Sequence, residues 1–191
     1  NLFRRFPTNY YSTMALSTGM IHGLIMMLGF GWLLPLGVLS ARLMKHRPDN
    51  LWFKLHQKLQ WSGILIGLIG FCIAVKNFDV YSDPKGSTSH QHGVLGAITF
   101  ALILLQALVA VFRLGMAIIG GEGTSRARTL WQWKHKIVGY LLMILIFATI
   151  LLGAKMEGTS WQLAYVFGVV GSLVLIAGLM RFDRFSYQAT V

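Results

Sequence analysis

The sequence predicts an all-α fold, a polytopic membrane bundle of five transmembrane helices. Of the 191 residues, 55% are hydrophobic and only 12% are charged, and the mean hydropathy of +0.61 is too high for an ordinary soluble domain. Five apolar runs are each long enough to cross a hydrocarbon core, which needs roughly 20 helical residues. These runs lack the alternation of apolar and polar residues that marks the strands of a membrane barrel, so helices are the remaining structure.

The five predicted spans follow one another with short connections. They cover residues 14–43, 52–75, 90–118, 132–154 and 161–180. Pro35 is expected to kink the first span, because proline lacks the N–H group that a regular helix uses. Gly19 with Gly23, and Gly63 with Gly67, have the four-residue spacing that lets membrane helices approach closely. The fifth span contains no histidine and is interpreted as a packing helix.

Basic residues are unequally distributed between the two sides of the predicted bundle. Because successive spans alternate in direction, the connections on one side hold twelve Lys and Arg against three acidic residues, a net charge of +9. The other side holds five against three, a net charge of +2. The positive-inside rule places the more basic side in the cytoplasm. The N-terminus is then extracytoplasmic and the C-terminus cytoplasmic, in a plasma membrane or an endomembrane, and the charge does not predict nucleic acid as a partner.

Three parts of the chain are distinguished by composition. Residues 1–13 are interpreted as an extracytoplasmic linker from a missing N-terminal domain, 14–154 as a four-helix core, and 155–191 as the fifth span with a cytoplasmic tail. Cys72 is the single cysteine, so an intrachain disulfide and a thiolate metal cluster are excluded. We expect Cys72 to be a buried small apolar residue.

Four histidines each lie about one helical turn inside the start of a separate span: His22, His56, His92 and His135. An ionisable side chain inside a membrane is costly, which makes it a candidate functional residue. The first and third spans begin outside, so they place His22 and His92 at one outer level. The second and fourth spans place His56 and His135 together at an inner level.

This arrangement favours two haem groups over zinc. Two imidazoles that face each other across a helix bundle can supply both axial ligands of a haem iron. Zinc usually takes four N, S or O ligands, and neither pair has an obvious Cys, Asp or Glu at its depth. The sequence therefore predicts a four-helix di-haem core with two b haems. Because both axial positions are filled, the expected activity is electron transfer through the bilayer, over ligand levels on the order of 20 Å apart.

Further polar residues are candidates for weaker roles at these sites. Arg42 and Arg113 are candidate cofactor-binding residues, since haem propionates need basic partners near the interface. Lys58 and Arg113 are candidates for binding an anionic electron donor, which the basic side would attract. His46 lies in a basic loop and is expected to be solvated. His90 points away from the direction of His92, so only one of the two can face the bundle.

These motifs resemble the cytochrome b561 family, particularly the branch fused behind an extracellular DOMON domain, which includes ferric-chelate-reductase-like proteins. The matching stretches cover the first four spans: His22-Gly23 through Trp32, Pro35-Leu36-Gly37 and Arg42; Trp52-Phe53-x-x-His56; His92-Gly93-x-x-Gly96 to Gln106 and Arg113; and Trp131 through His135 and Gly139. The chain departs from the six-span form of the family by showing five spans.

The resemblance implies a transmembrane oxidoreductase of the ascorbate-dependent ferric-chelate reductase type. Electrons would pass from cytosolic ascorbate or a similar reductant to an extracytoplasmic ferric chelate, monodehydroascorbate or an attached DOMON haem. His56 and His135 would hold the cytoplasmic haem, and His22 and His92 the outer one. Two alternatives stay open: a haem-containing membrane anchor or assembly subunit, and a quinol-linked cytochrome b subunit of a larger complex. A homodimer also stays open.

Overall fold

The computed structural model describes residues 17–79, 82–118 and 125–190, and this part of the chain is helical and contains no strand. The first span consists of α1 (Thr18–Met26), the π-helical segment η1 (Met27–Leu33) and α2 (Leu34–Leu43). The helices α3 (Leu51–Asn77), α4 (Thr88–Ile118) and α5 (Ser125–Glu157) follow. The fifth span consists of α6 (Thr159–Leu163), the π-helical segment η2 (Ala164–Val170) and α7 (Gly171–Thr190).

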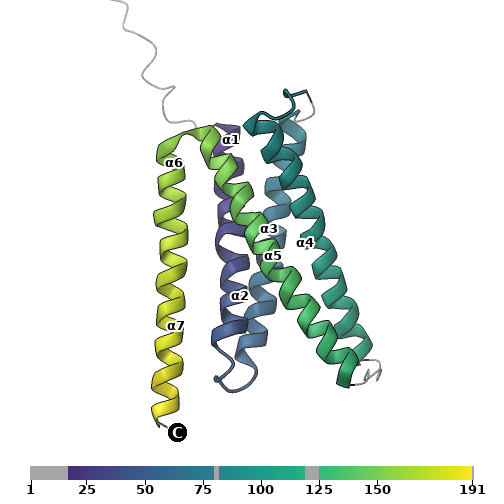
Figure 1. The fold of residues 1–191 in the computed structure, drawn as a ribbon, viewed down its shortest axis with the longest axis vertical. Coiled ribbons are helices and arrows are strands. Elements are labelled where there is room, and N and C mark those ends of the chain that lie inside the picture. Colours follow the sequence, from purple (N-terminus) through teal and green to yellow (C-terminus); the bar gives the residue numbers. More distant parts are fainter. Residues whose placement is uncertain (1–16, 80–81, 119–124, 191) are drawn as a thin grey trace, which may run out of the picture.

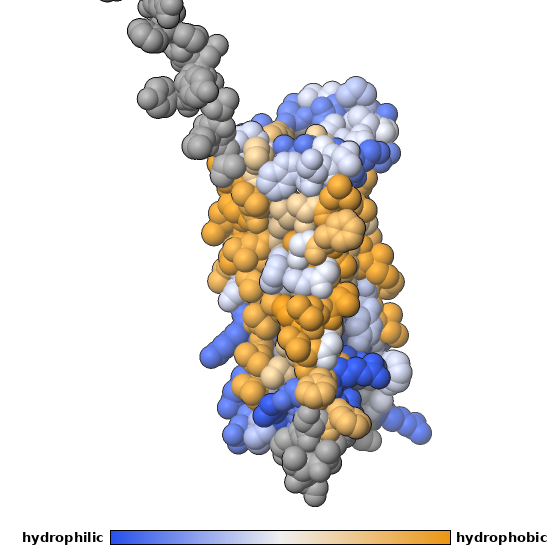
Figure 2. Space-filling view, turned by 90° about the vertical axis from the view of Figure 1, so that its left-hand side faces the viewer, coloured by the Kyte–Doolittle hydropathy of each residue, from blue (hydrophilic) through white to orange (hydrophobic). Residues whose placement is uncertain are grey.

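Five helical segments are long and apolar enough to cross a membrane, which confirms the predicted all-α membrane bundle. Figure 2 shows a broad hydrophobic band between two hydrophilic ends. The predicted spans differ from the helices mainly at their ends. The helix of the fourth span, α5, begins at Ser125 rather than at residue 132. Hydropathy marks the part of a helix that lies inside the membrane and does not mark a polar extension of the same helix. The predicted linker 1–13 lies outside the described residues, and the division into three parts stays a prediction.

The bundle consists of two antiparallel hairpins and one outer helix. The first span packs along α3, and α4 packs along α5, whereas the fifth span lies against α2 and η1. Figure 1 shows α7 on the far side of α2 from α4 and α5. The histidine-bearing helices are therefore grouped two by two, and the fifth span covers one flank.

Close contact between the first span and α3 depends on glycines, as the spacing of Gly63 and Gly67 predicts. A Cβ atom at Gly63 would lie 2.9 Å from the carbonyl oxygen of Gly29, and one at Gly67 would overlap the ring of Phe30. The other predicted pair differs, because a Cβ at Gly23 would meet nothing within 4 Å. A Cβ at Gly70 would likewise lie 2.7 Å from the sulfur of Met26 on α1, so Gly63 and Gly70 both serve helix contact.

The expected disturbance at Pro35 takes the form of the π-helical segment η1, which ends just before it. Proline cannot donate a backbone hydrogen bond, and its ring crowds the preceding turn, so the helix there shifts to wider hydrogen bonding. Cys72 is exposed rather than buried, which corrects our expectation. In a membrane helix the face away from the bundle is apolar, so a small apolar residue can occupy it equally well.

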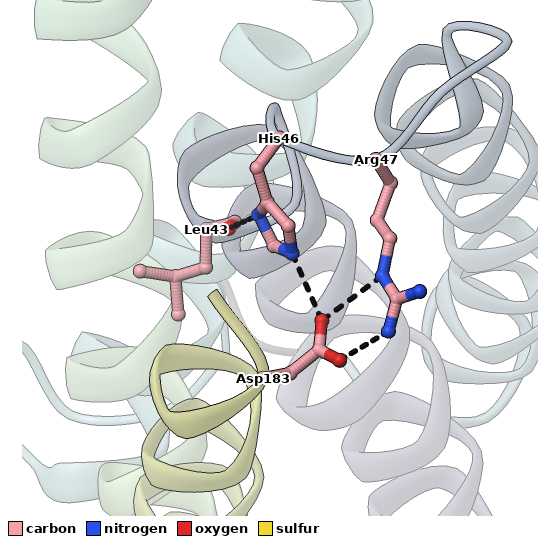
Figure 3. A network of polar contacts seen from close by, with 4 residues as sticks. All are labelled: Leu43, His46, Arg47 and Asp183. Atoms are coloured by element: carbon pink, nitrogen blue, oxygen red, sulfur yellow. Dashed lines mark hydrogen bonds and ion pairs between the residues drawn. The ribbon is translucent and has the colours of Figure 1, made fainter. Parts of the chain in front are cut away.

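A polar network joins the fifth span to the connection between α2 and α3 (Figure 3). The Asp183 carboxylate accepts a hydrogen bond from Arg47 Nε at 3.0 Å and contacts His46 Nε2 at 2.9 Å. The other imidazole nitrogen of His46 contacts the Leu43 carbonyl oxygen at 3.0 Å. The expectation of a solvated His46 was therefore wrong, since its side chain is only 7% exposed. Basic loop composition did not reveal that an acid on the last helix would cover it.

Candidate functional site

The structure brings the four span histidines together as two pairs. His22 on α1 faces His92 on α4, with ring centroids 6.1 Å apart and ring planes at 85°. His56 on α3 faces His135 on α5, with centroids 6.3 Å apart and planes also at 85°. Each pair takes one histidine from each hairpin. Both pairs therefore bridge the interface between the hairpins.

The spacing of each pair suits a single metal ion between the two rings. A metal–imidazole bond is about 2.0 Å long and the ring centroid lies about 1.1 Å beyond the nitrogen, so two imidazoles on opposite sides of one metal have centroids about 6 Å apart. Within the described residues, no group of three or more His, Cys, Asp or Glu could hold a metal ion. The donor set is thus two imidazoles per site, as for an iron whose other ligands come from a porphyrin.

Three of the four imidazoles are oriented by backbone carbonyl oxygens. The Nδ1 atoms of His22, His56 and His92 lie 2.9, 2.8 and 2.9 Å from the carbonyl oxygens of Gly70, Gly37 and Thr149. Each carbonyl belongs to the other helix of the same hairpin. A carbonyl can only accept, so each Nδ1 carries the proton and donates it. The lone pair is then on Nε2, which is the form of histidine that binds a metal.

Glycines lie at two of these helix contacts, and one of them lies directly against an imidazole. A Cβ atom at Gly153 would lie 2.8 Å from Cε1 of His92, so a larger residue there would displace the ring. A Cβ at Gly37 would lie 2.5 Å from Nε2 of Gln60, which donates to the Leu34 carbonyl oxygen at 2.9 Å. Small residues therefore allow the two helices of each hairpin to meet where a histidine is held.

The fourth histidine, His135, has side-chain partners instead. The amide Nε2 of Gln106 lies 3.0 Å from Nδ1 of His135 and donates to the carbonyl oxygen of His135 at 2.8 Å. The ring of Trp131 stacks on the imidazole, with centroids 5.1 Å apart and planes at 12°. Trp131, which begins the motif stretch that runs to His135, therefore contacts that histidine directly.

A cavity of about 380 Å³ surrounds the pair His56 and His135. All four core helices line it, with largely apolar side chains and a few polar ones. Arg113 is among its lining residues, and so is Arg128, which sequence reasoning did not single out for a site role. The indole Nε1 of Trp131, also a lining residue, is buried and has no hydrogen-bond partner among the described residues. A ligand with anionic oxygen atoms would suit these donors.

The other two predicted basic residues lie elsewhere. Arg42 is in the last turn of α2 and Lys58 is on α3; both are exposed, and neither lines the cavity. His90 is not part of the pair in which His92 faces His22. Arg42 and Lys58 therefore remain predictions without a contact at the site.

Phenylalanine rings fill the bundle between the two pairs. Phe71 stacks on Phe100 with centroids 4.3 Å apart, and Phe30 lies 6.1 Å from Phe100. Fifteen residues separate His22 from Gly37, whose carbonyl contacts His56; this is about 22 Å along a helix. Phe30 and Phe100 each follow the outer histidine of their own span by eight residues. The cluster therefore lies about midway between the two histidine levels.

The sequence is similar to that of known membrane proteins. A model of the eukaryotic cytochrome b561 family matches residues 21–160, which include all four paired histidines. A cytochrome b561, DM13 and DOMON domain-containing protein of Arabidopsis thaliana is 34% identical over 138 residues, 72% of this chain and 15% of that protein. A cytochrome b561 and DOMON domain-containing protein of the same plant is 32% identical over 160 residues, 83% of this chain and 40% of that protein.

The name of a more distant relative states an activity. Human ferric-chelate reductase 1 is 26% identical over 161 residues, 78% of this chain and 25% of that protein. No solved structure matches the chain significantly. The chain thus spans less than half the length of these curated relatives.

Proposed function

Because the chain belongs to the eukaryotic cytochrome b561 family, we propose that it carries electrons across a membrane through two b haems, one at each histidine pair. The family consists of haem b proteins that transfer electrons across membranes, and the chain is an integral membrane oxidoreductase. His22 with His92 would be the axial ligands of one haem, and His56 with His135 those of the other.

One observation carries this proposal: each pair joins the two hairpins at a centroid spacing of 6.1 or 6.3 Å, which suits one bound metal. The backbone contacts of His22, His56 and His92 support it further, because they leave Nε2 as the lone-pair nitrogen.

The cavity at the inner pair supports a porphyrin there. Its apolar lining suits a macrocycle, and Arg113, Arg128 and the indole N–H of Trp131 are the donors that would hold haem carboxylates. Gly139 lines the same cavity, and a Cβ there would meet only Gln106, at 3.8 Å. Near the His22–His92 pair, a Cβ at Gly23 would meet nothing within 4 Å, so no side chain crowds that position.

A haem held by two of these histidines would supply one-electron transfer rather than chemistry on a bound substrate. The chain's part is to hold the four imidazoles at two levels and to exclude water between them with apolar packing such as Phe30, Phe71 and Phe100. We propose that the donor is cytosolic ascorbate or a similar anionic reductant, attracted by the basic side of the protein. We propose ferric chelate, monodehydroascorbate or a DOMON haem as the extracytoplasmic acceptor.

Electron transfer across a closed bilayer tests this function. Liposomes carrying the full chain would be loaded with ascorbate and given a ferric chelate outside, while the absorbance bands of b haem are followed. The proposal expects reduction of the haems by ascorbate and ferrous product outside. Liposomes carrying His56→Ala are the matched control and should give ferrous product at the rate of protein-free liposomes.

The same measurement distinguishes electron transfer from the main alternative function. A haem-containing membrane anchor or assembly subunit would bind haem but would neither be reduced by ascorbate nor reoxidised by the chelate. Equal rates in liposomes with and without the chain would contradict the proposed function. A quinol-linked cytochrome b subunit would instead require quinol for haem reduction.

A further inference from the structure

The Gly37 carbonyl oxygen accepts hydrogen bonds from two side chains. Nδ1 of His56 lies 2.8 Å from it, and the hydroxyl Oγ of Ser40 donates to it, also at 2.8 Å. In a regular α-helix such as α2, the backbone N–H four residues later faces the same oxygen. A carbonyl oxygen has two lone pairs, so these donors compete for it. The hydrogen bond that orients His56 is therefore shared with Ser40.

The carbonyl oxygens that orient His22 and His92 have no such competitor on their own helices. A side chain that bonds back to a carbonyl of its own helix lies three or four residues later in the sequence. The residues at those positions have no side-chain donor: Ile73 and Ala74 after Gly70, and Leu152 and Gly153 after Thr149. The hydroxyl of Ser40 thus distinguishes the environment of His56.

The direction of both hydrogen bonds follows from the acceptor. A carbonyl oxygen can only accept, so the Ser40 hydroxyl and the Nδ1–H of His56 both donate to it. Nε2 of His56 keeps its lone pair, as a metal ligand requires. Ser40 is 0% exposed, so water does not replace its hydroxyl at this oxygen. The positive end of the hydroxyl dipole is therefore held beside the donating side of the imidazole.

Sharing the acceptor changes the imidazole as a ligand. A carbonyl that accepts the Nδ1 proton makes the imidazole a stronger electron donor, which favours the oxidised metal. Ser40 weakens this effect, because the oxygen divides its negative charge between two side-chain protons. The positive end of the hydroxyl dipole also disfavours the added positive charge of the oxidised metal. Both effects have the same sign, and both are strong where water is excluded.

Resting on the proposed function, we propose that Ser40 is a positioning residue that raises the reduction potential of the His56–His135 site. It acts through the Gly37 carbonyl oxygen and His56, without contacting the metal. A serine hydroxyl that bonds back to its own helix is common. The distinguishing observation here is that its acceptor also orients a proposed haem ligand. A higher potential makes reduction of this site by the electron donor more favourable.

The test measures midpoint potentials of the haem-loaded chain by spectroscopic redox titration. The wave that His56→Ala removes identifies the inner site. Ser40→Ala removes the hydroxyl with little change in volume, and the Gly37 carbonyl oxygen keeps its hydrogen bond from His56. This variant should shift the inner wave to lower potential and leave the outer wave unchanged. Ser40→Cys, whose thiol is a weaker donor, should shift the inner wave in the same direction by less.

Ser172 provides the matched control. Its hydroxyl donates to the carbonyl oxygen of Val169, also three residues earlier, at 2.7 Å, and none of the four paired histidines has its Nδ1 at that oxygen. Ser172→Ala should leave both waves in place.

An inner wave of Ser40→Ala that coincides with the wild-type wave, or that moves together with the outer wave, would overturn this inference alone. If Ser40→Ala fails to retain the inner haem, the inner wave of Ser40→Cys decides in its place by the same criterion. A wild-type chain that binds no haem would overturn the proposed function and this inference together.

Discussion

Backbone atoms hold three of the four imidazoles in place, so the residues that matter at these sites include ones whose side chains do nothing there. The Thr149 and Gly70 carbonyl oxygens accept hydrogen bonds from Nδ1 of His92 and His22. The position of each ring then depends on how closely the neighbouring helix approaches. Gly153 is the sharpest example, because a Cβ atom there would overlap the ring of His92.

We expect Gly153→Ala to displace His92 and release the outer haem. The new Cβ would lie 2.8 Å from Cε1 of the ring, closer than two carbon atoms can pack. Loss of the contacts that orient a ligating histidine typically lowers metal affinity by about 10- to 100-fold. The purified variant should therefore lose one of the two proposed haems and keep about half of the wild-type haem. Pyridine haemochrome analysis measures this ratio.

Gly168→Ala is the control for this substitution. A Cβ at Gly168 would meet nothing within 4 Å, and the residue lies in η2, away from both pairs. It should retain the wild-type haem content. Wild-type haem content in Gly153→Ala would show that the contact with His92 does not position a ligand.

Sequence reasoning identified the four histidines because an ionisable residue in an apolar span is conspicuous. Their backbone partners could not be identified in the same way, since every residue has a carbonyl group and only folding selects Gly37, Gly70 and Thr149. Gln106 did carry a signal, as a polar residue in the middle of an apolar run. Arg128 was harder to identify from the sequence, because it belongs to a set of basic residues that the positive-inside rule already explains.

The helices α3 and η1 meet backbone to backbone, which makes small residues on their shared face necessary. The closest approach joins Gly63 to Gly29, with a hypothetical Cβ at Gly63 only 2.9 Å from the Gly29 carbonyl oxygen and 2.8 Å from a methyl group of Leu34. A backbone oxygen cannot move aside as the end of a flexible side chain can. The contact therefore limits which residues the first hairpin accepts.

We expect Gly63→Ala to destabilise the bundle by about 1–3 kcal/mol, the usual cost of overpacking a close contact. Gly178→Ala on α7 is the control, because a Cβ there would meet nothing within 4 Å. Thermal unfolding in detergent, followed by circular dichroism, should give a lower midpoint for Gly63→Ala alone. Equal midpoints for the two variants would contradict the packing argument.

Apolar runs predicted the five spans well, because each run is long and a helix that crosses the hydrocarbon core must be predominantly apolar. The ends were less predictable, since α5 continues through polar residues that hydropathy excludes. The π-helical segments were not predicted either: Pro35 explains η1, whereas η2 has no proline within it. The prediction of the fifth span as a packing helix was also incomplete. It missed the contact of Asp183 with His46 and Arg47, which joins residues more than a hundred positions apart.

The whole molecule is an antiparallel bundle in which two hairpins oppose each other across two histidine pairs. Alternating span direction was sufficient to predict which histidines would pair, and the structure brings those pairs together. Their roles as haem ligands, the number of haems and the orientation in the membrane stay predictions. Each hairpin contributes one histidine to each site, so neither hairpin could complete a site alone.

The haem content of single and double histidine variants tests the central claim most directly. The wild-type chain should bind two b haems, and His22→Ala and His92→Ala should each leave one. The double variant of His22 and His92 should also leave one, because both substitutions remove the same site, whereas the double variant of His22 and His56 should leave none. Loss of both haems when His22 and His92 are replaced together, or one haem in the wild-type chain, would contradict the account.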